Sequence, residues 1–145
     1  MDKFKFEKLN IWQKAMDFGE IIDQLALKFP EREKFNLASQ IRRASDSIAL
    51  NISEGSIGQS NPEQKRFMGY SIRSLAEVVT CLFKAKRRYY IDEVKFIALY
   101  NEAFHFMNMM TAFRKNIHCP FTQSTIFCHP SILKINELLQ PKQPQ

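Results

Sequence analysis

The sequence predicts an all-α protein, an antiparallel up-down four-helix bundle, and three observations lead to that prediction. Apolar residues recur at intervals of three and four in four successive segments, which is the spacing of one face of an α-helix. The 145 residues include only four glycines and six prolines, and no proline lies inside a long periodic segment. The connections between the segments are short, as they are between antiparallel neighbours in a bundle. A single domain of this size can bury a substantial core.

The first two helices are expected over about residues 9–28 and 33–54. Phe29-Pro30 ends the first, because the residue before a proline disfavours the helical conformation. Gly55 is expected to end the second. One face of the second helix is apolar and consists of Leu37, Ile41, Ala44, Ile48 and Ile52.

A row of polar side chains borders that apolar face at intervals of three and four. Its members are Gln40, Arg43, Ser47, Asn51 and Glu54. Short polar residues in such a row favour an ordered polar contact that holds helix or subunit register. A capped amphipathic helix with a mixed border explains the periodicity equally well.

The third and fourth helices are expected over about residues 62–88 and 92–115. Asn61-Pro62-Glu63 is typical of a helix start, with an N-cap, a proline at the first position and an acidic first turn. Asp92 is the expected N-cap of the fourth helix. Together the four helices define a bundle domain over residues 1–118.

Residues 119–145 are expected to form a C-terminal tail, with one possible short helix at 131–139. The tail either docks on the bundle or a neighbouring subunit, or extends away. His118-Cys119 and Cys128-His129 form a mirrored pair that could bind zinc. Their spacing differs from the usual Cys-x-x-Cys pattern, so we expect no metal.

Positive charge is concentrated in the third helix. The net charge is +6, and residues 61–90 hold seven basic against two acidic groups, whereas the residues before 61 are neutral in sum. Six of these basic residues project opposite the apolar face: Lys65, Arg66, Arg73, Lys84, Arg87 and Arg88. Such a row is suited to phosphate contacts and predicts binding of RNA or DNA. A solvated helix face that keeps the protein soluble is the alternative.

The fourth helix is apolar over more of its circumference than one buried face requires. Its apolar residues are Ile97, Leu99, Tyr100, Ala103, Phe104, Phe106, Met107, Met110 and Phe113. Aromatic residues and methionine are enriched at interfaces, so we expect a second subunit to cover this helix. The alternative is a deeply buried helix covered by the tail.

No pattern indicates an enzyme, a cofactor or a metal site. Glu102-x-x-His105 has the spacing of a di-iron ligand pair, but the sequence has no second such pair. Cys81 is expected to pack rather than to act as a nucleophile. Three cysteines and the absence of a leading apolar segment favour a cytoplasmic location, and no apolar run is long enough to span a membrane.

Several motifs resemble a known family in the order in which they occur. They are Phe6-Glu-Lys-Leu9, Ile11-Trp-Gln-Lys-Ala15, Phe29-Pro30, Phe35-Asn-Leu37, the segment from Gln40 to Gly55, and Phe67, Ser71, Ser74, Leu75 and Glu77. Over about residues 4–118 the chain resembles the small four-helix-bundle proteins encoded in intervening sequences of bacterial 23S ribosomal RNA genes. A relative of that family is the accessory variability protein of diversity-generating retroelements.

The resemblance implies a ring-like homo-oligomer, a pentameric barrel, that binds nucleic acid and a reverse transcriptase. We therefore expect a non-enzymatic bacterial protein that binds RNA or DNA through the basic face of the third helix. The alternative is a scaffold that docks an acidic protein partner, such as a reverse transcriptase, without binding nucleic acid directly.

Overall fold

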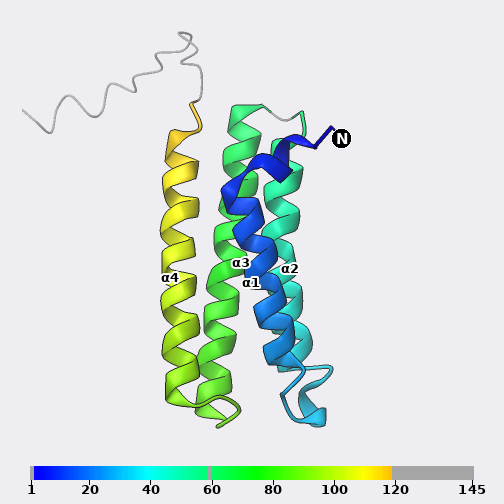
Figure 1. Cartoon of the computed structure of the whole chain (residues 1–145), viewed down its shortest axis with the longest axis vertical. Helices are drawn as coiled ribbons and strands as arrows, with labels where there is room; N and C mark the ends of the chain where they lie inside the picture. The colour runs from blue at the N-terminus through cyan, green and yellow to red at the C-terminus, as the bar shows by residue number, and fades with distance from the viewer. Residues whose placement is uncertain (1, 59, 119–145) are drawn as a thin grey trace, which may run out of the picture.

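The computed structural model describes residues 2–58 and 60–118, which form four long α-helices and two short 3-10 helices, with no strand in these ranges. The α-helices are α1 (Asn10–Ala26), α2 (Leu37–Ser56), α3 (Asn61–Arg87) and α4 (Glu93–Asn116), and the 3-10 helices are η1 (Lys5–Lys8) and η2 (Glu31–Glu33). Successive helices run in opposite directions (Figure 1). The predicted all-α class and the number of helices are confirmed. The predictions for residues 119–145, including the helix at 131–139, concern residues outside the described ranges.

The core lies between the inward faces of the helices. Its largest fully buried side chains include Phe18 of α1, Ile48 of α2, Leu75 of α3 and Phe106 of α4. The rings of Phe18 and Phe106 meet edge to face, with their centroids 5.9 Å apart. The most extensive contact joins α2 and α3, whereas α4 packs chiefly on α3 and lies at one side of the bundle (Figure 1).

The observed start of α2 differs from the expected one. The expected helix begins at residue 33, but α2 begins at Leu37, and Asn36 before it has the non-helical angles φ −122° and ψ −108°. The Glu33 carboxylate turns back and accepts a hydrogen bond from the Leu37 N–H at 3.2 Å. Glu33 therefore supports the helix start from outside the helix, and the local sequence pattern does not reveal this role.

Gly55 does not end α2 as expected. It is a buried residue in the last turn, and α2 continues to Ser56. The glycine with a positive φ is Gly58, at 62°. Gly55 is instead a point of close helix packing, because a Cβ placed there would lie 2.8 Å from the Cβ of Phe67.

Of the N-cap residues of α3 and α4, Asp92 forms a side-chain capping hydrogen bond and Ser60 does not. Asp92 accepts a hydrogen bond from the Lys95 N–H at 2.7 Å, which confirms it as the N-cap of α4. The N-cap of α3 is Ser60 rather than the expected Asn61, whose side-chain amide instead donates to the carbonyl of His118. In the part of the chain that the structure describes, no helix combines the length and apolarity needed to cross a membrane.

Candidate nucleic-acid interface

The predicted basic row of α3 divides into two groups along the helix. Lys65, Arg66 and Arg73 lie toward its N-terminal end, whereas Lys84, Arg87 and Arg88 lie at its C-terminal end. With a rise of about 1.5 Å per residue, the gap between Arg73 and Lys84 is about 16 Å. The row is therefore two separate patches rather than one continuous stripe.

Arg66 and Arg73 are exposed and lie across aromatic rings. The Arg66 guanidinium is 5.8 Å from the centroid of Phe67, and that of Arg73 is 5.7 Å from the centroid of Tyr70. Arg66 also lies 3.4 Å from the Glu63 carboxylate, in an exposed pair that contributes little stability. Both cations are thus oriented by their neighbours and remain accessible to a ligand.

The last turn of α4 adds two basic residues to this patch. The Arg114 Nε donates to the Lys65 carbonyl at 3.0 Å, and the guanidinium of Arg114 lies over Gly69. A shallow groove of about 440 Å³ is lined by Lys65, Ile72, Thr111, Arg114 and Lys115. We call Lys65, Arg66, Arg73, Arg114 and Lys115 the Arg66 cluster. Arg114 and Lys115 are absent from the sequence-based site, and only the antiparallel pairing of α3 and α4 would have indicated them.

The C-terminal group of α3 contains one residue that the fold itself uses. Arg88 Nη1 lies 3.0 Å from Oε1 of Glu33, whose side chain is buried with a relative exposure of only 7%. Lys84 and Arg87 are exposed and form no ion pair with any described residue. Arg88 is therefore engaged in the fold, whereas Lys84 and Arg87 are accessible.

Glu33 is the centre of a network that ties η2 to the turn between α3 and α4. The Tyr90 hydroxyl donates to Oε1 of Glu33 at 2.8 Å, and Arg32 Nη2 donates to that hydroxyl at 3.0 Å. The hydrogen bond from Tyr90 lowers the pKa of Glu33 most, with smaller contributions from the Leu37 N–H, Arg88 and Arg32, although burial opposes them. The ionised carboxylate is therefore the favoured form in this network.

The polar row of α2 forms an ordered contact with α3 in its central part. Asn51 Nδ2 donates to Ser47 Oγ at 3.0 Å, and the Ser74 hydroxyl donates to the same oxygen at 3.1 Å. At one end of the row, Gln40 donates to Glu77 at 3.3 Å. The remaining two members, Arg43 and Glu54, are exposed. Ser47 and Gln40 thus connect α2 to α3, and Asn51 supports Ser47 from its own helix. The helix-register role of the row stays a prediction.

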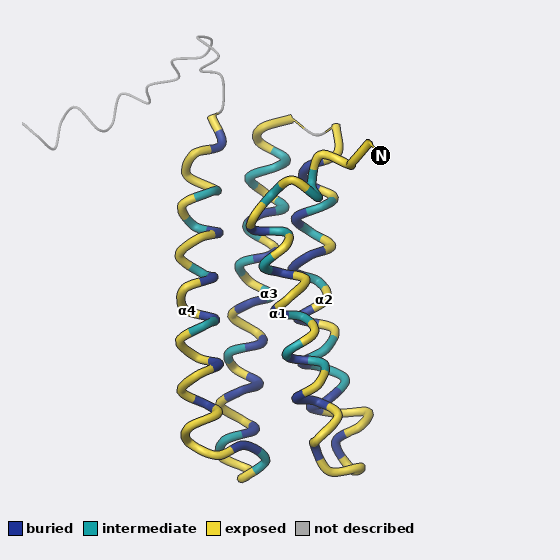
Figure 2. The backbone as a smooth tube through the Cα atoms, viewed as in Figure 1, coloured by how far each residue is buried: buried dark blue, intermediate teal, exposed yellow. Residues whose placement is uncertain are grey.

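The outer face of α4 is exposed and carries several large apolar side chains among polar ones. Figure 2 shows that the buried residues of α4 lie on the side facing α3, and that the opposite side is largely exposed. The exposed large apolar residues of α4 are Val94, Ile97, Tyr100, Phe104 and Met109. The exposed ring of Phe83 on α3 lies beside that of Tyr100, with their centroids 6.0 Å apart. A groove of about 220 Å³ between α3 and α4 is lined by Ala76, Val79, Tyr100, Ala103, Phe104 and Met107. The described residues therefore do not bury α4 on all sides.

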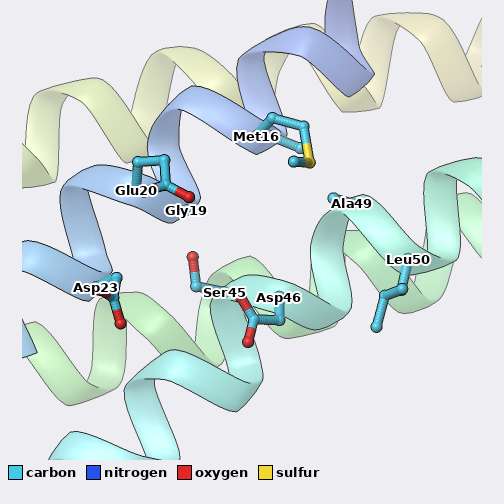
Figure 3. A pocket seen from close by; sticks show the side chains of 9 residues that line it. Met16, Gly19, Glu20, Asp23, Ser45, Asp46, Ala49 and Leu50 are labelled. Atoms are coloured by element: carbon cyan, nitrogen blue, oxygen red, sulfur yellow. The ribbon is translucent and has the colours of Figure 1, made fainter. Parts of the chain in front are cut away.

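A groove between α1 and α2 has the opposite charge. It has a volume of about 480 Å³, and Glu20, Asp23 and Asp46 stand along it (Figure 3). The buried hydroxyl of Ser45 points toward α1, 3.8 Å from where a Cβ on Gly19 would lie. Arg42 offsets part of this charge, with its Nε 2.8 Å from Asp23. An acidic groove of this kind repels phosphate, so any polyanion is directed to the other faces of the bundle.

The described residues that were considered for catalysis and metal binding are not grouped as a metal site. Glu102 forms an ion pair with Lys14 at 2.5 Å, and His105 is exposed. Burial raises the pKa of the Cys81 thiol. Among the described residues no three His, Cys, Asp or Glu side chains are grouped so that they could hold a metal ion. The zinc ligands considered at Cys119, Cys128 and His129 lie outside the described residues.

Comparison with known proteins places the chain in a family. The family model described as 23S rRNA-intervening sequence protein matches residues 7–112. Among curated proteins, none is significantly similar to this chain. A crystal structure of a protein with unknown function from the S23 ribosomal protein family of Bacteroides thetaiotaomicron VPI-5482 has the same fold, with a TM-score of 0.67 and 22% sequence identity. The similarity covers 72% of this chain and 98% of that protein. The chain therefore belongs to the family of 23S rRNA-intervening sequence proteins.

Proposed function

We propose that this protein is a non-enzymatic, homo-oligomeric four-helix bundle that binds RNA or DNA through the Arg66 cluster. The observation that supports this most directly is a groove lined by Lys65 of α3 and by Arg114 and Lys115 of α4. The exposed Arg66 and Arg73 follow two of its lining residues, Lys65 and Ile72, in the sequence of α3. The two acidic residues of α3 are Glu63, three positions before Arg66, and Glu77, four positions after Arg73. Lys84 and Arg87 form a second, smaller basic patch that contacts the same polyanion.

Charge rather than base sequence provides the affinity in this proposal. Each phosphate that a basic residue neutralises releases condensed counterions, so affinity falls as salt rises. Five such contacts give a slope of log K against log salt of about −4.5 on duplex DNA. The bundle presents no helix of a known groove-reading motif, which agrees with binding that depends little on base sequence.

Self-association through the outer face of α4 is the second part of the proposal. Phe104 has 57% of its surface exposed, and it stands beside Tyr100, Ile97 and the groove that both α3 and α4 line. Large apolar patches are uncommon on monomers and mark interfaces. A ring-like homo-oligomer, a pentamer by the resemblance described above, would cover this face and repeat the Arg66 cluster around the ring. We place this assembly in the bacterial cytoplasm.

One observation favours a protein ligand instead of a nucleic acid. The groove of the Arg66 cluster includes Ile72 and Thr111 beside its cations, a mixture that also fits an acidic peptide with apolar side chains. In that case the protein is a scaffold for an acidic partner, such as a reverse transcriptase, and does not contact nucleic acid directly.

The test is fluorescence anisotropy with labelled structured RNA and duplex DNA across a salt series, on protein whose mass has been fixed by light scattering. Arg66→Glu combined with Arg73→Glu should weaken binding at least tenfold and flatten the salt dependence without changing the mass. The matched control is Lys28→Glu combined with Lys95→Glu, which makes the same change in charge at exposed positions outside the cluster. Absence of binding at low salt, or equal binding by both double variants, would overturn the proposal.

A further inference from the structure

The turn after α3 holds an aromatic residue in a conformation that normally requires glycine. Tyr89 has φ 60°, and it is the non-glycine residue with a positive φ within the described ranges. The Tyr89 N–H donates to the Lys86 carbonyl at 3.0 Å, and the Tyr90 N–H donates to the Ala85 carbonyl at 2.9 Å. This is the hydrogen-bond pattern of a Schellman motif, in which the left-handed position is usually glycine.

No packing in the described fold compensates for this strain. The Tyr89 side chain is 94% exposed, so its ring has almost no contact with the bundle. Strained backbone of this kind is concentrated at functional sites, where the side chain must be presented in a fixed position. The turn therefore holds the Tyr89 ring in an exposed position where a ligand can contact it.

A second exposed aromatic ring stands at the same end of the bundle. Phe35 is 89% exposed, and it follows η2, the segment that Glu33 ties to Arg88 and Tyr90 on either side of Tyr89. Figure 1 shows the connection between α1 and α2 and the turn between α3 and α4 together at one end of the molecule. The Glu33 network thus fixes the two segments that carry these rings relative to each other.

Accessible positive charge accompanies the two rings. Three acidic residues at this end are paired with basic neighbours: Glu31 with Lys34 at 3.1 Å, Glu33 with Arg88 at 3.0 Å and Glu93 with Lys86 at 2.7 Å. Lys84 and Arg87, in the last turn of α3 before Tyr89, form no ion pair among the described residues. This end of the bundle therefore presents exposed aromatic rings together with unneutralised cations.

We infer that this end of the bundle binds unpaired bases of single-stranded nucleic acid, with Tyr89 and Phe35 as stacking surfaces and Lys84 and Arg87 as phosphate contacts. Bases stack on exposed aromatic side chains when no partner strand covers them, and nearby cations follow the backbone. A base pair inside a duplex offers no free face to such a ring. The inference rests on the proposed function and deepens it, because it specifies which form of the polyanion the second basic patch recognises.

The decisive variant is Tyr89→Gly, because glycine adopts a positive φ without strain and preserves the turn. The variant should melt at a temperature equal to or above that of the wild type, and it should bind single strands more weakly by about 5- to 150-fold, the range expected for loss of stacking on one base. The probes are a labelled 12-nucleotide RNA without self-complementarity and a 12-base-pair RNA duplex, in the same buffer. Duplex affinity should stay within about twofold of the wild type.

Two further variants test whether the aromatic rings themselves provide the affinity for single strands. Tyr89→Phe keeps the ring and should retain single-strand affinity, whereas Phe35→Ala should lower it in the same direction as Tyr89→Gly. Unchanged single-strand affinity of Tyr89→Gly would overturn the inference, and a protein would then be the expected ligand of this end of the bundle. Equal losses on single strand and duplex would also overturn it. Neither result affects the proposed function, which depends on the separate comparison of the Arg66 and Arg73 double variant with its control.

Discussion

Gly55 of α2 faces Phe67 of α3 so closely that a Cβ on Gly55 would lie 2.8 Å from the Cβ of Phe67. Both atoms would be fixed to the backbone, so a rotamer change cannot relieve the contact, and the two helices would have to separate.

We therefore expect Gly55→Ala to lower the free energy of unfolding by about 1–3 kcal/mol, measured by urea denaturation. Gly19→Ala is the matched control, since the nearest atom to its Cβ would be Ser45 Oγ at 3.8 Å, an ordinary contact. Alanine is favoured over glycine in a helix, so that variant should be as stable as the wild type or more so. Equal effects of the two substitutions would show that the contact at Gly55 does not limit helix approach.

Stability should decline with acid partly through Glu33. Its pKa in the folded state is lowered from the ordinary value of 4.5 by the hydrogen bond from Tyr90, with help from the Leu37 N–H, Arg88 and Arg32. The unfolded carboxylate therefore takes up its proton at a higher pH than the folded one. The stabilisation is complete above the unfolded pKa and is lost as the pH falls below 4.5 through the lower folded pKa.

Urea denaturation of Glu33→Gln at a series of pH values tests this. The variant should be less stable than the wild type at pH 7, and the difference should shrink as the pH falls below 4.5 and through the lowered pKa of the folded Glu33. Glu31→Gln is the control, because that carboxylate is exposed and paired only with Lys34. A difference between wild type and Glu33→Gln that stays constant with pH would contradict the role of the ionised Glu33.

Cys81 should resist thiol reagents in the folded protein. Its side chain is fully buried in the core of α3, and burial raises the pKa of its thiol, which reduces the reactive thiolate at any given pH. In a Cys119→Ala and Cys128→Ala background, labelling with a chromogenic disulfide at pH 8 should be slow and should accelerate when urea unfolds the bundle. Immediate complete labelling without denaturant would mean that the core opens readily at α3.

A substitution on the outer face of α4 should change the mass of the protein in solution. Phe104→Glu places a charge among the exposed apolar side chains of this face, so it should dissociate the oligomer that we propose, as measured by light scattering. Phe35→Glu makes the same substitution at an exposed ring on another part of the surface and should leave the mass unchanged. A wild-type protein that is monomeric at micromolar concentration would contradict the role given to this face.

Local signals in the sequence were sufficient for the helices and for some of their ends. The four apolar repeats correspond to α1–α4, and Asp92 caps α4 as its position before a periodic segment predicts. The spacing of Ser47 and Asn51 indicated a polar contact, and the structure supplies its partner on the next helix, Ser74. These features depend on residues within a few turns of one another.

The features that the sequence did not reveal depend on residues far apart in the chain. The local sequence assigns Glu33 to a helix, because the residues that bind its carboxylate, Tyr90 and Arg88, lie 57 and 55 positions away in the chain. The local sequence likewise assigns Arg88 to the exposed basic row, because it does not show that Arg88 binds Glu33. Arg114 joins the Arg66 cluster only because α4 returns beside the start of α3 and brings it to the Lys65 carbonyl.

The hydrogen bond between the Asn61 side chain and the His118 carbonyl also has a practical consequence for binding measurements on protein immobilised on a surface. It places the exit of the chain from α4 beside the start of α3, and the N-terminal residues lie at this end too (Figure 1). Tyr89 lies beyond the far end of α3, which has 27 residues and is about 40 Å long. A protein immobilised through a tag at the N-terminus would therefore present Tyr89 to the analyte and hold the Arg66 cluster near the support, so the two sites should be compared with both partners free in solution.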